Sequence, residues 1–97
     1  ISDVIDALTA AATARKVSQL VINVGSGIAI SLNELVKAVG EATGATLEPL
    51  HNNIESSGVM KMCADLTLAR KKLGYRPRVS LPEGLRRTIV SDERLQA

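Results

Sequence analysis

Three features of this 97-residue chain could take part in chemistry: a glycine turn, a single histidine and a single cysteine. The turn Gly25-Ser26-Gly27 could hold a phosphate group through its backbone N–H groups. The favoured alternative is a tight turn at the end of the apolar run before it, because the next helix signal comes only at Ser31. We therefore expect the turn to redirect the chain.

His51 and Cys63 are the residues whose side chains could serve acid–base or nucleophilic catalysis. His51 opens the polar, loop-like stretch of residues 51–58, which favours a solvated position in a loop. Cys63 lies in a stretch that alternates apolar and polar residues, which favours a buried, unreactive thiol. A single cysteine makes no internal disulfide, and no Cys/His cluster has metal-site spacing. A reducing compartment, and hence the cytoplasm, is the default expectation.

Lysine and arginine are concentrated in the last third of the chain. An anionic partner such as a nucleotide phosphate or RNA is one interpretation, and a solvated surface stabilised by a helix dipole is the favoured one. Nucleic acid is disfavoured because the net charge is only +2 and the chain has one aromatic residue. No apolar run approaches the ~20 residues that span a bilayer, so no membrane contact is expected. The cations are Arg70, Lys71, Lys72, Arg76, Arg78, Arg86 and Arg87.

Helix signals recur along the chain and predict the elements that must position these residues. Residues 2–14 have apolar side chains on one face, and Ser2 or Asp3 could cap the start. Capping residues and stop residues mark the ends of three further predicted helices. These signals are a Ser31/Glu34 capping box with a stop at Gly44, an Asp65 cap with a stop at Gly74, and a Ser80/Glu83 capping box with Pro82 in the first turn.

Strand signals fall between these helices and predict an α/β arrangement. Residues 20–24 form an apolar run typical of a strand covered on both faces, while residues 46–50 and 59–63 are weaker candidates on either side of a polar loop. Two or three short strands cannot supply both the layers that would cover this strand and the neighbouring strands that would pair with it. We therefore predict that residues 1–97 form a single domain whose few short strands and amphipathic helices belong to a larger sheet.

Several ordered motifs resemble the tail of the extended short-chain dehydrogenases/reductases, the NAD-dependent nucleotide-sugar epimerases and dehydratases. Residues 64–89 have the family layout AD-xxx-AR-xx-LGY-x-P-xx-SL-x-EGLR-x-TI. Residues 21–27 are similar to the family's Tyr-Asn-Val-Gly-Ser-Gly, and residues 31–35 to its Ser-Leu-x-Glu-Leu. The resemblance covers nearly the whole chain. It implies the carboxy-terminal, substrate-binding lobe of a Rossmann-type isomerase or lyase acting on a nucleotide-sugar.

The same resemblance implies that the catalytic parts of the family are missing here. The family holds NAD on a Gly-x-x-Gly-x-x-Gly turn, whereas the only glycine cluster here is Gly25-Ser26-Gly27. The family's acid/base pair is Tyr-x-x-x-Lys, whereas Tyr75 is followed at the fourth position by Val79. We therefore expect no NAD bound by this chain alone and no catalysis by it alone. A Rossmann portion preceding it, or another chain, would be its partner.

The substrate side also departs from the family. Many relatives carry Arg-x-Gly-Asp-Val before the Ala-Asp pair, and their arginine holds the sugar-nucleotide phosphates. Here Glu55 takes the place of that arginine and would repel a diphosphate, while Ser57 takes the place of the glycine. Lys61 and Ser57 are the predicted substrate-binding residues. A small stand-alone binding domain without enzymatic activity stays open as the alternative.

Overall fold

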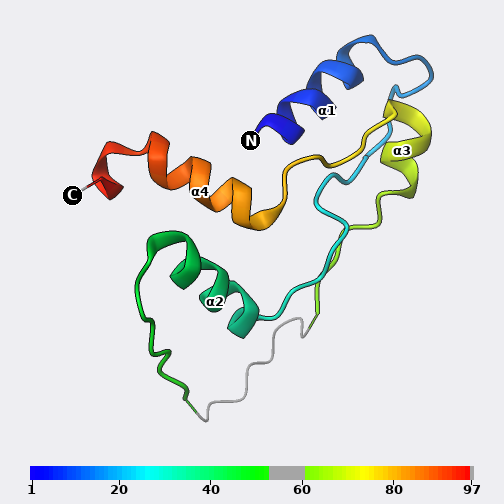
Figure 1. The fold of residues 1–97 in the computed structure, drawn as a ribbon. Helices are drawn as coiled ribbons and strands as arrows, with labels where there is room; N and C mark the ends of the chain where they lie inside the picture. Colours follow the sequence, from blue (N-terminus) through cyan, green and yellow to red (C-terminus); the bar gives the residue numbers. More distant parts are fainter. Residues whose placement is uncertain (53–60, 97) are drawn as a thin grey trace. The chain divides into compact units, whose positions relative to one another are not determined.

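The computed structural model describes residues 1–52 and 61–96, and every regular element in those ranges is helical. The chain divides into two compact units, which are described separately below. The first unit comprises Ile1–Ala29 and Met62–Val79, and the second comprises Ile30–Lys61 and Ser80–Ala97. The elements are α1 (Ser2–Thr13), α2 (Leu32–Thr43), α3 (Thr67–Leu73), α4 (Leu81–Ser91) and a 3-10 helix, η1 (Glu93–Leu95) (Figure 1).

The predicted α/β lobe is wrong, because residues 1–52 and 61–96 contain no strand. Residues 20–24, 46–50 and 61–63 are irregular, and residues 59 and 60 lie outside the described ranges. A strand needs a neighbouring backbone to complete its hydrogen bonds, and no such ladder forms here. The first segment was also predicted to be covered on both faces, but only alternate residues of it are covered. Ile22 and Val24 pack against the core of the first unit, whereas Val21 is 87% exposed.

The cap signals of α2 are confirmed at both ends. The Glu34 backbone N–H donates to the Ser31 hydroxyl at 3.1 Å, and the Ser31 backbone N–H donates to the Glu34 carboxylate at 2.6 Å. These reciprocal bonds are the predicted capping box, and they lower the pKa of Glu34. Gly44 ends the helix with a φ of 70°, a left-handed conformation that glycine adopts without steric cost.

The cap signals of α3 and α4 are confirmed only in part. The Asp65 carboxylate accepts the Thr67 backbone N–H at 2.9 Å, so it covers the start of α3 although Leu66 is the capping position. The Glu83 backbone N–H donates to the Ser80 hydroxyl at 3.4 Å. The reciprocal bond of a capping box does not form, because the Glu83 carboxylate pairs with Arg86 and Arg87.

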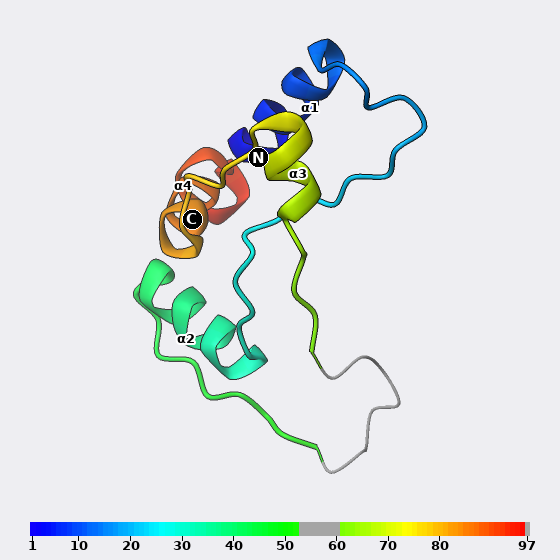
Figure 2. The same ribbon diagram turned by 90° about the vertical axis from the view of Figure 1, so that its right-hand side faces the viewer.

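The core of the first unit is small and lies between α1 and α3, which pack together (Figure 2). Its buried residues are Ala7, Leu66, Ala69 and Tyr75. Helix α1 contributes Ala7, which lies on the same side of the helix as Asp3, Ala10 and Ala14. The close packing of α1 therefore uses small side chains and an aspartate.

The large apolar residues of α1 lie on the other side of the helix and are exposed to solvent. The exposed fractions are 42% for Val4, 53% for Ile5 and 66% for Leu8. The sequence correctly places these residues on one face of a helix, but that face does not cover the core. The predicted cap at Ser2 or Asp3 is also wrong, since the capping position is Ile1 and no side chain bonds there.

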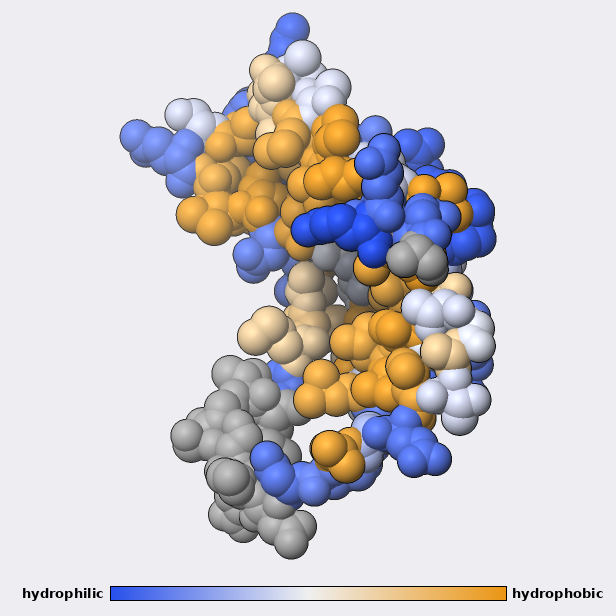
Figure 3. Space-filling view, turned by 90° about the vertical axis from the view of Figure 1, so that its left-hand side faces the viewer, coloured by the Kyte–Doolittle hydropathy of each residue, from blue (hydrophilic) through white to orange (hydrophobic). Residues whose placement is uncertain are grey.

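The second unit is a pair of helices with no fully buried residue in either helix. Helices α2 and α4 pack against each other, and Leu35, Val36 and Val39 of α2 are half-buried. Leu85 and Ile89 of α4 are half-buried in the same way. Figure 3 shows how much hydrophobic side-chain surface stays open to solvent. Two short helices give each other only one covered face.

Replacing the α2 cap should destabilise the second unit. Ser31→Ala removes the acceptor of the Glu34 N–H, and it should lower the free energy of unfolding by about 1 kcal/mol. Urea denaturation followed by circular dichroism measures this change. Ser18→Ala, at an exposed serine outside the helices, is the control and should leave the urea midpoint unchanged. Equal midpoints for Ser31→Ala and the native chain would show that the cap contributes nothing.

Candidate functional site

The Gly25-Ser26-Gly27 turn packs tightly against the segment that leads into α3. A Cβ atom on Gly25 would lie 3.1 Å from the Cβ of Ala64, and one on Gly27 would lie 2.9 Å from a methyl group of Leu66. Gly27 also has a φ of 72°, which other residues rarely adopt. The turn is therefore built for close contact with residues 64–66.

The Ser26 hydroxyl bonds within the turn itself. The Ser26 hydroxyl accepts the Ile28 backbone N–H at 3.2 Å and lies 3.2 Å from the Ile28 carbonyl oxygen. The next helix begins only at Leu32, so no helix N-terminus follows the glycines directly. The dinucleotide-binding arrangement places a pyrophosphate on a helix that opens at the glycine turn. The turn Gly25-Ser26-Gly27 therefore differs from that arrangement, and it matches the favoured prediction of a tight turn.

Tyr75 links this turn to the segment that follows α3. Its hydroxyl donates to the Gly25 carbonyl oxygen at 2.8 Å, across fifty residues of sequence. The tyrosine is only 6% exposed, and this burial raises the pKa of its phenol. A buried phenol that already donates its proton to a backbone carbonyl is poorly suited to act as a catalytic base. Tyr75 is therefore a positioning residue of the first unit.

Asp3 ties the N-terminus of α1 to the same segment. Its carboxylate accepts the backbone N–H of Arg78 at 3.1 Å and that of Val79 at 3.1 Å. These hydrogen bonds, led by the one from Val79, hold the pKa of Asp3 below its usual value. One turn further along α1, the Asp6 carboxylate pairs with the Arg78 guanidinium. Two acidic side chains of one helix thus hold residues 78 and 79.

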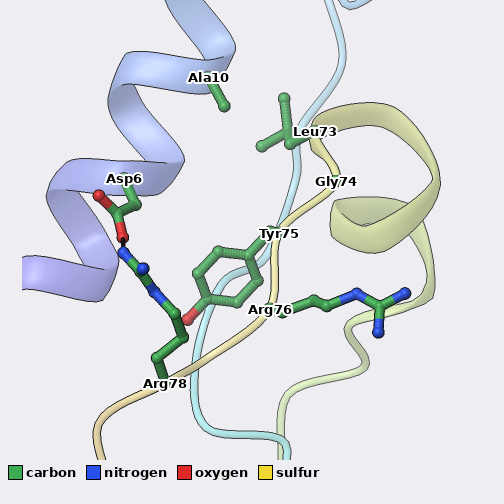
Figure 4. Close-up of a pocket in the computed structure, with 7 residues that line it drawn as sticks. All are labelled: Asp6, Ala10, Leu73, Gly74, Tyr75, Arg76 and Arg78. Carbon is green, nitrogen blue, oxygen red and sulfur yellow. Dashed lines mark hydrogen bonds and ion pairs between the residues drawn. The ribbon is translucent and has the colours of Figure 1, made fainter.

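A shallow cavity of about 380 Å³ lies beside this junction (Figure 4). Ala10, Leu73 and the ring of Tyr75 give it an apolar wall, and the Asp6–Arg78 pair closes one side. The Arg76 side chain extends away from that pair in Figure 4. Because the two guanidinium groups diverge, the cavity does not form a two-arginine clamp for a phosphate.

Of the two predicted substrate-binding residues, the structure describes only Lys61. Lys61 is exposed, and Ser57 lies outside the described ranges, as do Glu55 and Val59. His51 is exposed in an irregular segment, as predicted. Cys63 is also exposed, so the prediction of a buried thiol is wrong. The burial prediction depended on a strand over residues 59–63, and the described part of that stretch, residues 61–63, is irregular.

The arginines of the last third have different partners in the structure. Arg78 pairs with Asp6, while Arg86 and Arg87 both pair with Glu83. The two cations and their hydrogen bonds lower the pKa of Glu83 to about 2. The side chains of Arg70, Lys71 and Arg76 are exposed to solvent. Within the described residues, the favoured interpretation of a solvated surface fits these three.

The roles of Asp3 and Asp6 were missed at the level of sequence. Their spacing of three places both on neighbouring positions of one helix, which was a signal for a shared partner. The partner, Arg78, is 72 residues away from Asp6, and local patterns carry no information about such pairs. In the described part of the chain, no cluster of His, Cys, Asp or Glu has the geometry of a metal site. No helix in that part could cross a membrane.

Comparison with known proteins relates the chain to nucleotide-sugar epimerases. It is 35% identical over 89 residues to a UDP-glucose 4-epimerase from Mycolicibacterium smegmatis, and this match covers 92% of the chain. It is 31% identical over 70 residues, or 71% of the chain, to a UDP-glucuronate 4-epimerase from Thermodesulfobacterium geofontis. The matches span only 28% and 22% of the lengths of those two proteins. No family model and no solved structure matches the chain.

These matches support a relationship with the epimerase and dehydratase group at the family level. They agree with the resemblance that the ordered motifs indicated. Because each match covers less than a third of the relative, it does not carry that protein's activity over to this chain.

Removing the charge of Asp3 should weaken the first unit in a pH-dependent way. At pH 7, Asp3→Asn should lower the melting temperature by a few degrees, because the amide is a weaker acceptor for the N–H groups of residues 78 and 79. The lowered pKa in the folded state means that this stabilisation is present above the usual value of 3.8. It is lost as the pH falls through the lowered value, so the difference between the two proteins should shrink there.

Thermal unfolding from pH 7 down to pH 2.5 measures this difference. Glu48→Gln, at an exposed carboxylate in the second unit, is the control and should leave the melting temperature unchanged at pH 7. A constant gap between the native chain and Asp3→Asn across the whole pH range would contradict the role assigned to the carboxylate.

The Tyr75 hydroxyl should contribute to stability through its bond to Gly25. Tyr75→Phe keeps the ring but leaves the Gly25 carbonyl without its donor, and it should lower the free energy of unfolding by about 1 kcal/mol. Urea denaturation gives this value directly. An unchanged midpoint would mean that water replaces the hydroxyl at no cost.

Proposed function

We propose that this chain is the carboxy-terminal, substrate-binding portion of a nucleotide-sugar epimerase or dehydratase. The observation that carries the proposal is the 35% identity to a UDP-glucose 4-epimerase over 92% of the chain. A second 4-epimerase, named for UDP-glucuronate, matches 71% of the chain. Both names share a sugar joined to a uridine diphosphate, so a UDP-sugar is the proposed ligand.

The contacts of the first unit disfavour a catalytic role for its tyrosine and its glycine turn. Tyr75 is buried and bonded to a backbone carbonyl, and the Gly25-Ser26-Gly27 turn is filled by contacts with residues 64–66. Neither feature offers an acid/base pair or a dinucleotide cradle. We therefore propose that NAD and the acid/base pair belong to a partner polypeptide, which holds the cofactor while this chain contributes to the sugar-nucleotide pocket.

Lys61 and Ser57 are the residues proposed to contact the ligand. Lys61 is exposed, and its ammonium group could donate to a diphosphate oxygen. It lies four residues before Asp65, in the stretch where the family places its phosphate contacts. A cation there would offset the negative charge of Glu55, which takes the place of the family arginine.

A chimera tests this proposal in a complete protein. The Mycolicibacterium smegmatis UDP-glucose 4-epimerase would carry this chain in place of the segment that matches it, and UDP-glucose binding would be measured by calorimetry. Lys61→Ala should weaken binding about tenfold, the loss expected for one charge-assisted hydrogen bond to a phosphate. Added salt should narrow that difference, because it screens exposed charges.

Lys37→Ala is the matched control, since Lys37 is also an exposed lysine of the second unit. It should leave the affinity for UDP-glucose unchanged. Equal affinities for Lys61→Ala and Lys37→Ala would remove Lys61 from the site. A folded chimera that binds no UDP-glucose would reject the binding role of the whole chain.

A further inference from the structure

Helix α1 presents its largest side chains to solvent along one stripe. The outer stripe of α1 is defined here as Ile1, Val4, Ile5 and Leu8, with exposed fractions of 94%, 42%, 53% and 66%. Ile1, at the capping position, and Leu8 each lie three or four residues from both Val4 and Ile5, which places the four on one side of the helix. Single exposed apolar residues are common on proteins, whereas an aligned set of four on one helix face marks an interaction surface.

The outward direction of this stripe is set by specific contacts. The Asp3 carboxylate bonds the backbone of residues 78 and 79, and Asp6 pairs with Arg78. These bonds fix the rotation of α1 about its axis, so that Ala7 faces the core and the outer stripe faces away. A helix free to bury its largest apolar residues would turn the other way. The exposure therefore belongs to the folded arrangement of the first unit.

We propose that the outer stripe of α1 is the surface through which this chain docks onto the remaining polypeptide of an epimerase. This inference rests on the proposed function, and it adds the contact surface and the kind of partner. The partner would present an apolar surface to the stripe. Arg15 and Lys16 follow the end of α1 and are exposed, so a carboxylate on the partner would complement that end.

Two observations favour this partner over a second copy of the chain. The relatives extend far beyond the matched segment, since the chain spans only 28% and 22% of their lengths, and most of such a protein is available to cover the stripe. Four side chains are also far fewer than the roughly 20–30 residues on each side of a standard stable interface. Two copies that met on this stripe alone would be held weakly. A stripe that is covered within one larger core does not need an interface of that size.

The chain offers a closely matched pair of double variants for the test. Ile5→Ser with Leu8→Ser removes residues that are 53% and 66% exposed. Leu95→Ser with Val90→Ser removes residues that are 53% and 64% exposed in the second unit. In the chain alone, both doubles lose similarly exposed side chains, so their effects on melting temperature should be small and similar.

In the epimerase chimera, the two double variants should differ in melting temperature. The native chimera should unfold in one cooperative transition, and the Ile5→Ser/Leu8→Ser double should lower its melting temperature by about 10 °C because it loses two buried side chains. The Leu95→Ser/Val90→Ser double should lower it far less. Equal effects of the two doubles, or a chimera that unfolds in two separate transitions, would overturn the docking proposal.

Two further measurements separate the possible failures. Analytical ultracentrifugation of the chain alone should show a monomer, and a dimer that Ile5→Ser/Leu8→Ser dissociates would overturn the proposal in favour of a second copy. UDP-glucose binding by the chimera reports on the proposed function independently. One cooperative transition that the α1 double weakens, together with no UDP-glucose binding, would reject the binding role while supporting the docking surface.

Discussion

The contact between the Asp3 carboxylate and the backbone of residues 78 and 79 decides how the first unit is organised. A carboxylate that accepts two N–H groups is directional, unlike apolar packing, and it holds both the position and the rotation of α1. With α1 held this way, Ala7 meets the core and the closest packing is made by small side chains. The segment it anchors also carries Tyr75, whose hydroxyl secures the glycine turn at Gly25. Three distant parts of the sequence are thus joined by polar bonds.

The described residues of both units bury little apolar surface. Four residues form the core of the first unit, and α2 and α4 contain no buried residue. Stability in a small domain comes mainly from apolar area removed from water, and the entropy of ordering each residue opposes it. A chain with so few buried residues gains much from a partner that covers its exposed faces. This explains physically why hydrogen bonds between distant residues and helix caps are prominent in this structure.

Local sequence signals predicted only part of the candidate site, because its other contacts join residues that are distant in the sequence. The tight turn at Gly25-Ser26-Gly27 was predictable, because glycine spacing and the late helix signal are both local features. The filling of that turn by Ala64 and Leu66, and the bond from Tyr75, depend on residues about 40 and 50 positions away. The spacing of residues along the chain does not predict such long-range contacts. The relationship to epimerases was predictable from ordered motifs, since a family resemblance needs no knowledge of the fold.

The sequence by itself determined where the helices lie and which face of each is apolar. Capping side chains, glycine stops and the helical repeat act within a few residues, so α2, with its Ser31 cap and Gly44 stop, could be located in advance. Only the tertiary structure decided whether an apolar segment becomes a strand and which helix face turns inward. Residues 20–24 are an apolar run typical of a buried strand, yet no backbone ladder supplies their hydrogen bonds within the described ranges. In α1, Asp3 and Asp6 have their partners at residues 78 and 79, and the face that turns inward is the one that carries Asp3 and Ala7.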